Sequence, residues 1–151
     1  QVVGVYSTRY AEKLAETMRR LGSEHVLFVT GRDGLDECSI ATETDVVELK
    51  DGAIRRFVIT PEEVGLPRGE LADVQVHNPE ESAALLEAVM TVTAPESAVN
   101  IVALNAGVAL YAAGKTKTIA DGVTMAKDAI LSNAAYRQLQ RLRAKEVVRD
   151  A

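Results

Sequence analysis

The sequence is poor in residues that several classes of protein need. Among 151 residues it has one cysteine, Cys38, no tryptophan and four prolines. A single cysteine excludes a disulfide within the chain and fits a reducing compartment. No uninterrupted apolar run approaches the roughly 20 residues of a membrane-spanning helix, and no secretory signal is visible. We therefore expect a soluble, cytoplasmic protein without a membrane partner.

Positive charge is also scarce. Lys and Arg number 17 against 22 Asp and Glu, which gives a net charge of −5. Such a chain lacks the overall basic surface that attracts nucleic acid, so we expect no nucleic-acid partner. The apolar content of 47% is sufficient for one domain with a sizeable core. We treat residues 1–151 as a single α/β domain.

The first thirty residues predict a strand, a helix and a second strand. The runs 2–6 (VVGVY) and 25–30 (HVLFVT) are typical of buried strands. Between them Ser7 or Thr8 caps a helix that runs to about Leu21. This order predicts parallel neighbouring strands joined by a crossover helix. The apolar residues of that helix at helical spacing are Tyr10, Leu14, Met18 and Leu21.

Residues 44–60 predict an antiparallel element. Two short β runs flank Asp51-Gly52, a dipeptide that favours the type I′ turn of a hairpin. A loop rich in Pro and Gly follows, and residues 74–76 are expected to add a short strand. The expected fold class is thus α/β, with a parallel-rich sheet, a β-hairpin or other antiparallel element, and flanking helices.

The remainder of the chain has a helical pattern. The signals that open its four expected helices are Asn78-Pro79 with Glu81, Thr93 with Glu96, Thr118 with Asp121, and Ser132 or Asn133. The helix over 97–114 is apolar nearly all round, which predicts a central, buried helix. Its small residues, including Gly107, would let neighbouring elements approach closely. The charged end, 141–149, is expected to face solvent.

The stretch 31–39 (GRDGLDECS) holds the strongest candidates for chemistry. It follows a predicted strand, and ligands of parallel α/β sheets bind beyond the carboxyl ends of strands. Asp36 and Glu37 lie side by side there. Mg²⁺ is often held by one or two carboxylates together with water and substrate phosphates, so this pair is a candidate metal site. An alternative stays open, in which the acids of a Gly-rich loop only cap a helix or face water.

The other polar residues are expected to be structural. Asn100 and Asn105 lie in the apolar helix, where buried amides normally bond to loops or neighbouring helices. His25 and His77 have no second ligand at metal spacing. Cys38 is expected to be small and inert, with a pKa raised by the adjacent carboxylates.

Four segments resemble anthranilate phosphoribosyltransferases in their order and spacing. They are VVGVYS (2–7), GRDGLDECS (31–39), ELKDGAIRRFVITPEEVGL (48–66) and ALNAGVALYAAGK (103–115). The resemblance runs to about Arg143 and is to the carboxyl-terminal half of those enzymes. Together with a start inside a strand at Gln1, it leads us to expect part of a longer enzyme.

The resemblance implies an activity. This family transfers the phosphoribosyl group of phosphoribosyl diphosphate (PRPP) to anthranilate, with release of diphosphate, in tryptophan biosynthesis. It implies the fold of the nucleoside phosphorylase and phosphoribosyltransferase class and a homodimeric parent enzyme. The family's DGLDE motif ligates Mg²⁺ through its acidic pair, which corresponds to Asp36 and Glu37. Asp33, the first acid of the motif, is not implied as a ligand, and no catalytic nucleophile is implied.

The resemblance also implies what lies outside the chain. The family's GTGGD and KHGNR segments, its helical domain and the arginine that holds anthranilate belong to the amino-terminal half. We therefore expect these 151 residues to be inactive alone and the full-length parent to be the transferase. Two alternatives remain, a non-catalytic paralogue that binds nucleic acid or nucleotide, and an interaction half that needs a partner chain.

Overall fold

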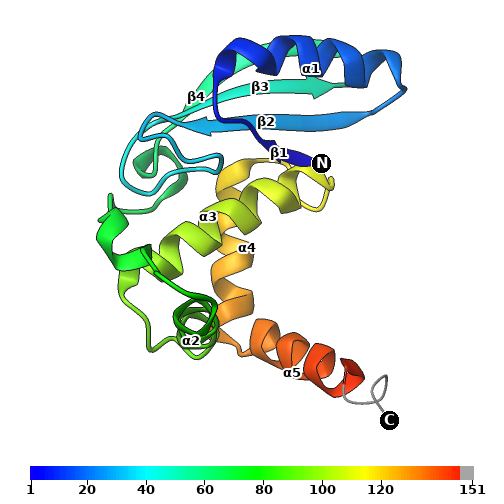
Figure 1. Cartoon of the computed structure of the whole chain (residues 1–151). Helices are drawn as coiled ribbons and strands as arrows, with labels where there is room; N and C mark the ends of the chain where they lie inside the picture. The colour runs from blue at the N-terminus through cyan, green and yellow to red at the C-terminus, as the bar shows by residue number, and fades with distance from the viewer. Residues whose placement is uncertain (147–151) are drawn as a thin grey trace.

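A computed structural model describes residues 1–146, which form a four-stranded sheet and five α-helices (Figure 1). The elements are β1 (Val2–Gly4), α1 (Thr8–Arg20), β2 (His25–Gly31), β3 (Thr44–Lys50), β4 (Ala53–Ile59), α2 (Pro79–Met90), α3 (Glu96–Ala112), α4 (Ile119–Leu131) and α5 (Ala134–Glu146). Two short 3₁₀ helices, η1 (Glu62–Val64) and η2 (Leu71–Val74), lie in the loop between β4 and α2. Within the described range, no helix has the length and apolar character that crossing a membrane requires.

The sheet is mixed, and its strands follow in the order β1-β2-β3-β4. β1 is parallel to β2, whereas β2 with β3 and β3 with β4 are antiparallel. The expected hairpin joins β3 and β4, and its turn residues Asp51 and Gly52 have φ values of 50° and 80°. Both values are positive, as the type I′ turn requires. The α/β class with an antiparallel element is therefore confirmed, but the described sheet is not parallel-rich, because one of its three strand pairings is parallel and two are antiparallel.

Two strand predictions differ from the structure. β1 is half-buried and ends at Gly4, because it is an edge strand of the described sheet. Its pairing continues for one more residue through a hydrogen bond from the Val5 N–H to the Val29 carbonyl. The strand expected over 74–76 is wrong. Val74 is the last residue of η2, and its apolar side chain packs in a hydrophobic cluster formed by residues of α2, α3 and α4.

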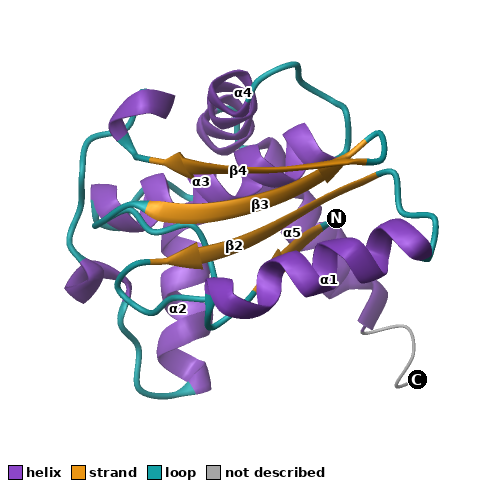
Figure 2. Cartoon of the chain, turned by 90° about the horizontal axis from the view of Figure 1, so that it is seen from above, coloured by secondary structure: helices purple, strands orange, loops and turns teal. Residues whose placement is uncertain are grey.

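Helix α1 covers one face of the sheet, as Figure 2 shows from above. It packs through Ala11 and Ala15, which are 1% and 0% exposed. The strand residues of this cluster are Val26, Phe28, Val47 and Leu49. The helix itself was expected from the sequence, but Tyr10 and Leu14 point away from the core. Because the side chains of Ala11 and Ala15 are small, α1 lies close to the sheet. The longer side chains of Tyr10 and Leu14 lie on the flanks of the helix.

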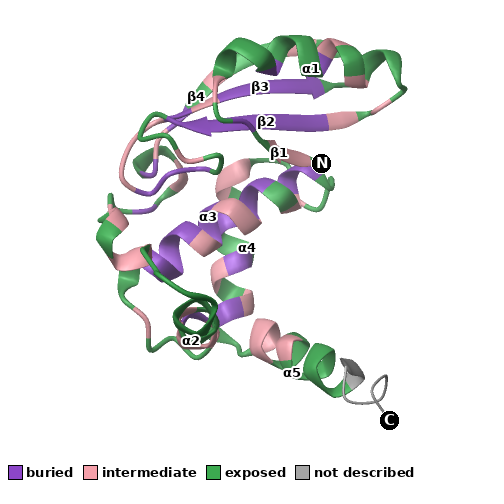
Figure 3. Ribbon diagram, in the orientation of Figure 1, coloured by how far each residue is buried: buried purple, intermediate pink, exposed green. Residues whose placement is uncertain are grey.

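Helix α3 covers the opposite face and is the most buried helix in Figure 3. Its residues Leu104 and Val108 are completely buried and pack against Leu27 and Val29 of β2. Burial of one such leucine contributes about 1.5–3 kcal/mol. The prediction of a central buried helix is confirmed.

The N-terminal signals of the helices were partly correct. The Asn78 side chain accepts a hydrogen bond from the Glu81 N–H, and Thr118 accepts one from the Asp121 N–H. The signal at Thr93 was wrong, because α3 begins after Pro95 without a side-chain cap. The Thr93 N–H instead donates to the Ala88 carbonyl and closes the end of α2.

Helix α5 carries three apolar residues at helical spacing, Tyr136, Leu139 and Leu142. Tyr136 and Leu139 are half-buried, but Leu142 is exposed. Of the segment expected to face solvent, 141–144 is exposed, and 147–149 lies outside the described residues.

Helices α3 and α4 cross with their backbones in contact. A Cβ atom added at Gly122 would lie 2.3 Å from the carbonyl oxygen of Gly107. One added at Gly107 would lie 2.5 Å from the backbone nitrogen of Val123. Neither neighbour is a flexible side chain, so neither can move aside. The prediction of a close approach at Gly107 is confirmed.

We predict that Gly122→Ala lowers the free energy of unfolding by about 1–3 kcal/mol, because the new methyl group separates two packed helices. Denaturant unfolding of the full-length protein measures the loss. Ala109→Ser, on the exposed side of α3, is the matched control and should change stability little. Equal stability of Gly122→Ala and the parent would contradict the close contact.

Candidate functional site

The loop between β2 and β3 carries the acidic pair and lies at the carboxyl ends of the parallel strands. β1 and β2 run in the same direction, so their ends meet at one edge of the sheet. Figure 1 shows this loop beside the sheet edge and above α3. It crosses the end of β1 so closely that a Cβ on Gly4 would lie 1.7 Å from the Asp36 carbonyl oxygen. A side chain at Gly4 would therefore displace the backbone of the acidic pair.

Hydrogen bonds within the loop fix the stretch before the pair. The Gly31 N–H donates to the Leu35 carbonyl at 2.8 Å. The Asp33 carboxylate accepts from the Leu35 N–H at 3.2 Å and from the Ser39 hydroxyl. Both oxygens of Asp33 are thus engaged inside the loop. Asp33 therefore helps to hold the shape of the loop, and its absence from the metal ligands stays a prediction.

The stretch after the pair is fixed by Asn105 of α3. Its Oδ1 accepts from the Cys38 N–H at 2.9 Å, and its Nδ2 donates to the Cys38 carbonyl at 2.9 Å. The expectation of a core amide bonded to a loop is confirmed for Asn105. It is wrong for Asn100, whose buried Oδ1 has no hydrogen-bond partner among the described residues.

Asp36 and Glu37 themselves project from this fixed backbone. Both are exposed, and Glu37 lines a cleft of about 310 Å³ with apolar residues of α2 and α3. Nowhere in residues 1–146 do three His, Cys, Asp or Glu side chains gather in a way that would hold a metal. A pair of carboxylates fits Mg²⁺, which commonly takes one or two and completes its shell with water and phosphate oxygens. The two acids therefore match that donor set, and their role as ligands stays a prediction.

Cys38 is unsuited to chemistry. It is fully buried, and burial, followed by the nearby charge of Glu37, raises its pKa to about 12. The thiolate is thus not populated near neutral pH, and the thiol serves as a small core residue. The prediction that Cys38 is inert is confirmed. The main cause of its raised pKa is burial, whereas the sequence led us to expect the neighbouring charge as the cause.

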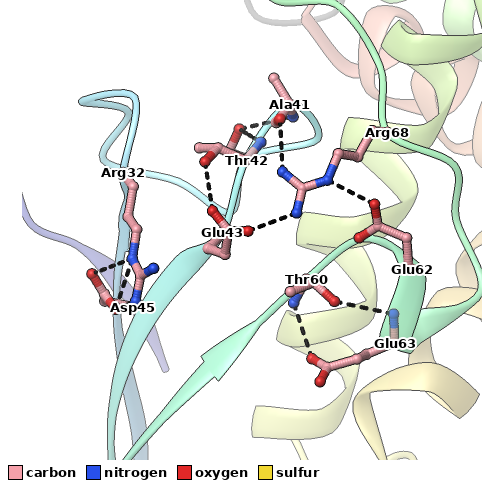
Figure 4. Close-up of polar contacts among 10 residues, drawn as sticks. Arg32, Ala41, Thr42, Glu43, Asp45, Thr60, Glu62, Glu63 and Arg68 are labelled. Carbon is pink, nitrogen blue, oxygen red and sulfur yellow. Dashed lines mark hydrogen bonds and ion pairs between the residues drawn. The ribbon is translucent and has the colours of Figure 1, made fainter.

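Figure 4 shows an ion-pair cluster that anchors the far end of the loop. Arg68 donates to Glu43 at 2.7 Å, to Glu62 at 2.7 Å and to the Ala41 carbonyl at 3.2 Å. The hydrogen bond from Arg68 is the main cause that lowers the pKa of Glu43 to about 2. Arg32 pairs with Asp45 where the loop enters β3. Both ends of the loop are therefore fastened to neighbouring segments.

A second polar centre lies at the opposite end of the sheet. Glu48 is completely buried, accepts from Arg55, and lies 2.8 Å from Nε2 of His25. Burial opposes its charge, but hydrogen bonds from Arg55, Tyr111 and His25 outweigh it and lower the pKa of Glu48. No motif of the sequence led us to predict this centre. A signal was present, because Glu48 sits within an apolar strand and pairs with Arg55 across the expected hairpin.

The two histidines have different surroundings. His25 belongs to the Glu48 centre, where its ring also lies against Tyr111 with the centroids 5.0 Å apart. His77 is exposed just before α2. The structure therefore does not bring the histidines to the acidic pair, in line with the structural role expected for them.

The low pKa of Glu43 predicts a dependence of stability on pH. The folded pKa of about 2 lies below the ordinary value of 4.5, so the charged form stabilises the fold. Its contribution is present above the ordinary value and disappears as pH falls through the folded value. We expect the difference in Tm between the parent protein and Glu43→Gln to be constant near pH 7 and to shrink from pH 4.5 towards pH 2.

Glu70→Gln, which removes a charge from the following loop, is the control for this measurement. Glu70 forms no ion pair within residues 1–146, so its variant measures the effect of removing a charge without breaking a pair. A difference for Glu43→Gln that does not change with pH would contradict the ion pair with Arg68.

Comparisons with known proteins give the family. A sequence profile described as "Glycosyl transferase family, a/b domain" matches residues 1–136. The chain is 85% identical over 151 residues to the anthranilate phosphoribosyltransferase of Geobacillus kaustophilus, and the match covers 100% of the chain and 44% of that protein. The chain thus spans less than half the length of this relative.

Solved structures agree with the sequence comparison. The crystal structure of anthranilate phosphoribosyltransferase from Thermus thermophilus is 38% identical, with a TM-score of 0.80 over 91% of this chain and 40% of that one. The enzyme from Saccharomyces cerevisiae in complex with PRPP and Mg is 27% identical, with a TM-score of 0.80 over 92% and 40%. The resemblance carried by the four sequence segments is confirmed, and the chain belongs to the glycosyl transferase family as part of its a/b domain.

Proposed function

We propose that this chain forms part of an enzyme that transfers the phosphoribosyl group of PRPP to anthranilate, with Asp36 and Glu37 as ligands of Mg²⁺. The observation that carries the proposal is the fixed presentation of this pair at the carboxyl edge of β1 and β2. Relatives that match the whole chain are named anthranilate phosphoribosyltransferases, and one related structure contains both PRPP and Mg.

The chemistry of the reaction explains the need for such a pair. Cleavage of the bond between the ribose and diphosphate leaves a cationic ribosyl centre and a strongly charged leaving group. Bound Mg²⁺ supplies charge neutralisation and orientation of the diphosphate. Asp36 and Glu37 provide hard oxygen ligands for the cation and project from the sheet edge into solvent, where a diphosphate has access.

The proposed reaction requires no nucleophile from the residues next to the acidic pair. Cys38, next to the pair, is buried and protonated, so it is not a nucleophile. No covalent intermediate is needed, since placing two substrates against one another supplies much of the acceleration in reactions of this kind. The groups that bind anthranilate and most groups that bind PRPP are expected outside this chain. The homodimer and the cytoplasmic location likewise remain predictions.

We predict that Asp36→Asn with Glu37→Gln, made in the full-length enzyme, lowers turnover at limiting Mg²⁺ at least tenfold, because the cation loses both charged ligands. Folding should be nearly intact, since both side chains are exposed. Steady-state rates over a Mg²⁺ titration measure the effect, and titration of Mg²⁺ with diphosphate checks binding directly. Glu80→Gln, on exposed α2, is the control for charge removal. Unchanged turnover at limiting Mg²⁺ would refute the metal site.

We also predict that the purified chain of 151 residues forms no phosphoribosyl anthranilate from PRPP and anthranilate. The reason is that the substrate-binding segments implied by the resemblance are expected outside it. The loss of anthranilate fluorescence follows the reaction, with the full-length enzyme as the positive control. Product formation by the chain alone would show that it carries a complete active site.

A further inference from the structure

We propose that Asn105 is a positioning residue for the acidic pair, and that its amide sets how tightly Asp36 and Glu37 bind a divalent cation. This inference rests on the proposed function, since it concerns the same metal site. It goes further because it assigns a role to a residue of the central helix that touches neither metal nor substrate.

The contact between Asn105 and the loop is specific in its geometry. One side chain satisfies both the N–H and the carbonyl of Cys38, each at 2.9 Å. The Nδ2 group also donates to the Ile101 carbonyl one helical turn earlier, at 3.0 Å, and this bond fixes the plane of the amide. Asn105 and Cys38 are 67 residues apart in the chain, so the contact joins two distant segments. Its loss would leave a backbone donor and acceptor without partners at a buried residue, a costly state.

The acidic pair occupies the short span between two fixed points. On one side, the Leu35 carbonyl accepts a hydrogen bond from the Gly31 N–H, and the Leu35 N–H donates to the Asp33 carboxylate. On the other side, Cys38 is held by Asn105 and is completely buried. Between them, the Asp36 carbonyl lies against Gly4 at the end of β1. The backbone of the pair has little freedom, although both side chains are exposed.

This arrangement matters for a cation that needs both carboxylates at once. Two ligands on a backbone that is already held in place lose less conformational freedom on binding than two ligands on a mobile loop. Groups that orient metal ligands without touching the metal commonly change metal affinity by about 10–100-fold when removed. Helix α3 is the most buried helix of the structure, which makes it a rigid base for such an orienting group.

The test is Asn105→Leu in the full-length enzyme, which keeps the approximate volume and removes all three hydrogen bonds. We expect the Mg²⁺ concentration for half-maximal rate to rise about tenfold, while kcat at saturating Mg²⁺ stays within about threefold. Titration of Mg²⁺ with diphosphate should show the same loss of affinity without turnover. The KM for anthranilate should not change.

Asn100→Leu is the matched control, because Asn100 is a buried amide of the same helix that makes no hydrogen bond to the loop. It should leave the Mg²⁺ requirement unchanged. If Asn105→Leu lowers Tm but leaves the Mg²⁺ requirement at the parental value, Asn105 is only a structural residue and the inference is wrong. If Asn105→Leu does not fold, Asn105→Asp replaces it under the same criterion, because it loses only the donors of the amide.

Asp36→Asn measured in parallel separates the two proposals. If it leaves the Mg²⁺ requirement unchanged, the metal site itself is refuted. If it raises the requirement and Asn105→Leu does not, only the positioning role of Asn105 fails.

Discussion

The pairing of the Asn105 amide with the Cys38 backbone joins the sheet to the helical part of the fold. The acidic loop leaves β2, and its other hydrogen bonds run within the loop, to the sheet and to the segment that carries Arg68. Through Asn105, the loop is bonded to α3, which packs against the sheet on one side and contacts α4 through its glycine on the other. The position of the acidic pair is therefore determined by the same packing that holds the core together.

Much of the fold was predictable because its signals are local. The hairpin follows from Asp51-Gly52, whose positive φ angles few other dipeptides accept. The starts of α2 and α4 follow from Asn78 and Thr118, which satisfy N–H groups three residues ahead. Local patterns failed where tertiary packing decided the outcome. The buried face of α1 is formed by alanines, which carry little hydrophobic signal, and Val74 was taken into a helical cluster.

The candidate site was likewise predictable from the sequence only in part. The adjacent acids after a predicted strand are visible in the sequence, and so is the end of the sheet at which they lie. The contacts that hold them come from Gly4, Gly31, Asp33 and Asn105, and of these residues Gly4 and Asn105 are distant in sequence. No periodicity indicates that an asparagine in an apolar helix will bond to one particular backbone unit. The same holds for Tyr111, which reaches the Glu48 centre from the end of α3.

The buried carboxylate of Glu48 has a consequence for strand alignment. Along β3, Glu48 faces α3, whereas its neighbour Leu49 faces α1. A slip of β3 by one residue against both β2 and β4 would turn the carboxylate towards Val26 and Phe28, among hydrocarbon side chains and away from Arg55. An unpaired charge in such surroundings is far more costly than a lost apolar contact. The buried glutamate thus excludes a misaligned β3, which the apolar residues on both faces of the strand, such as Val46 and Val47, would by themselves tolerate.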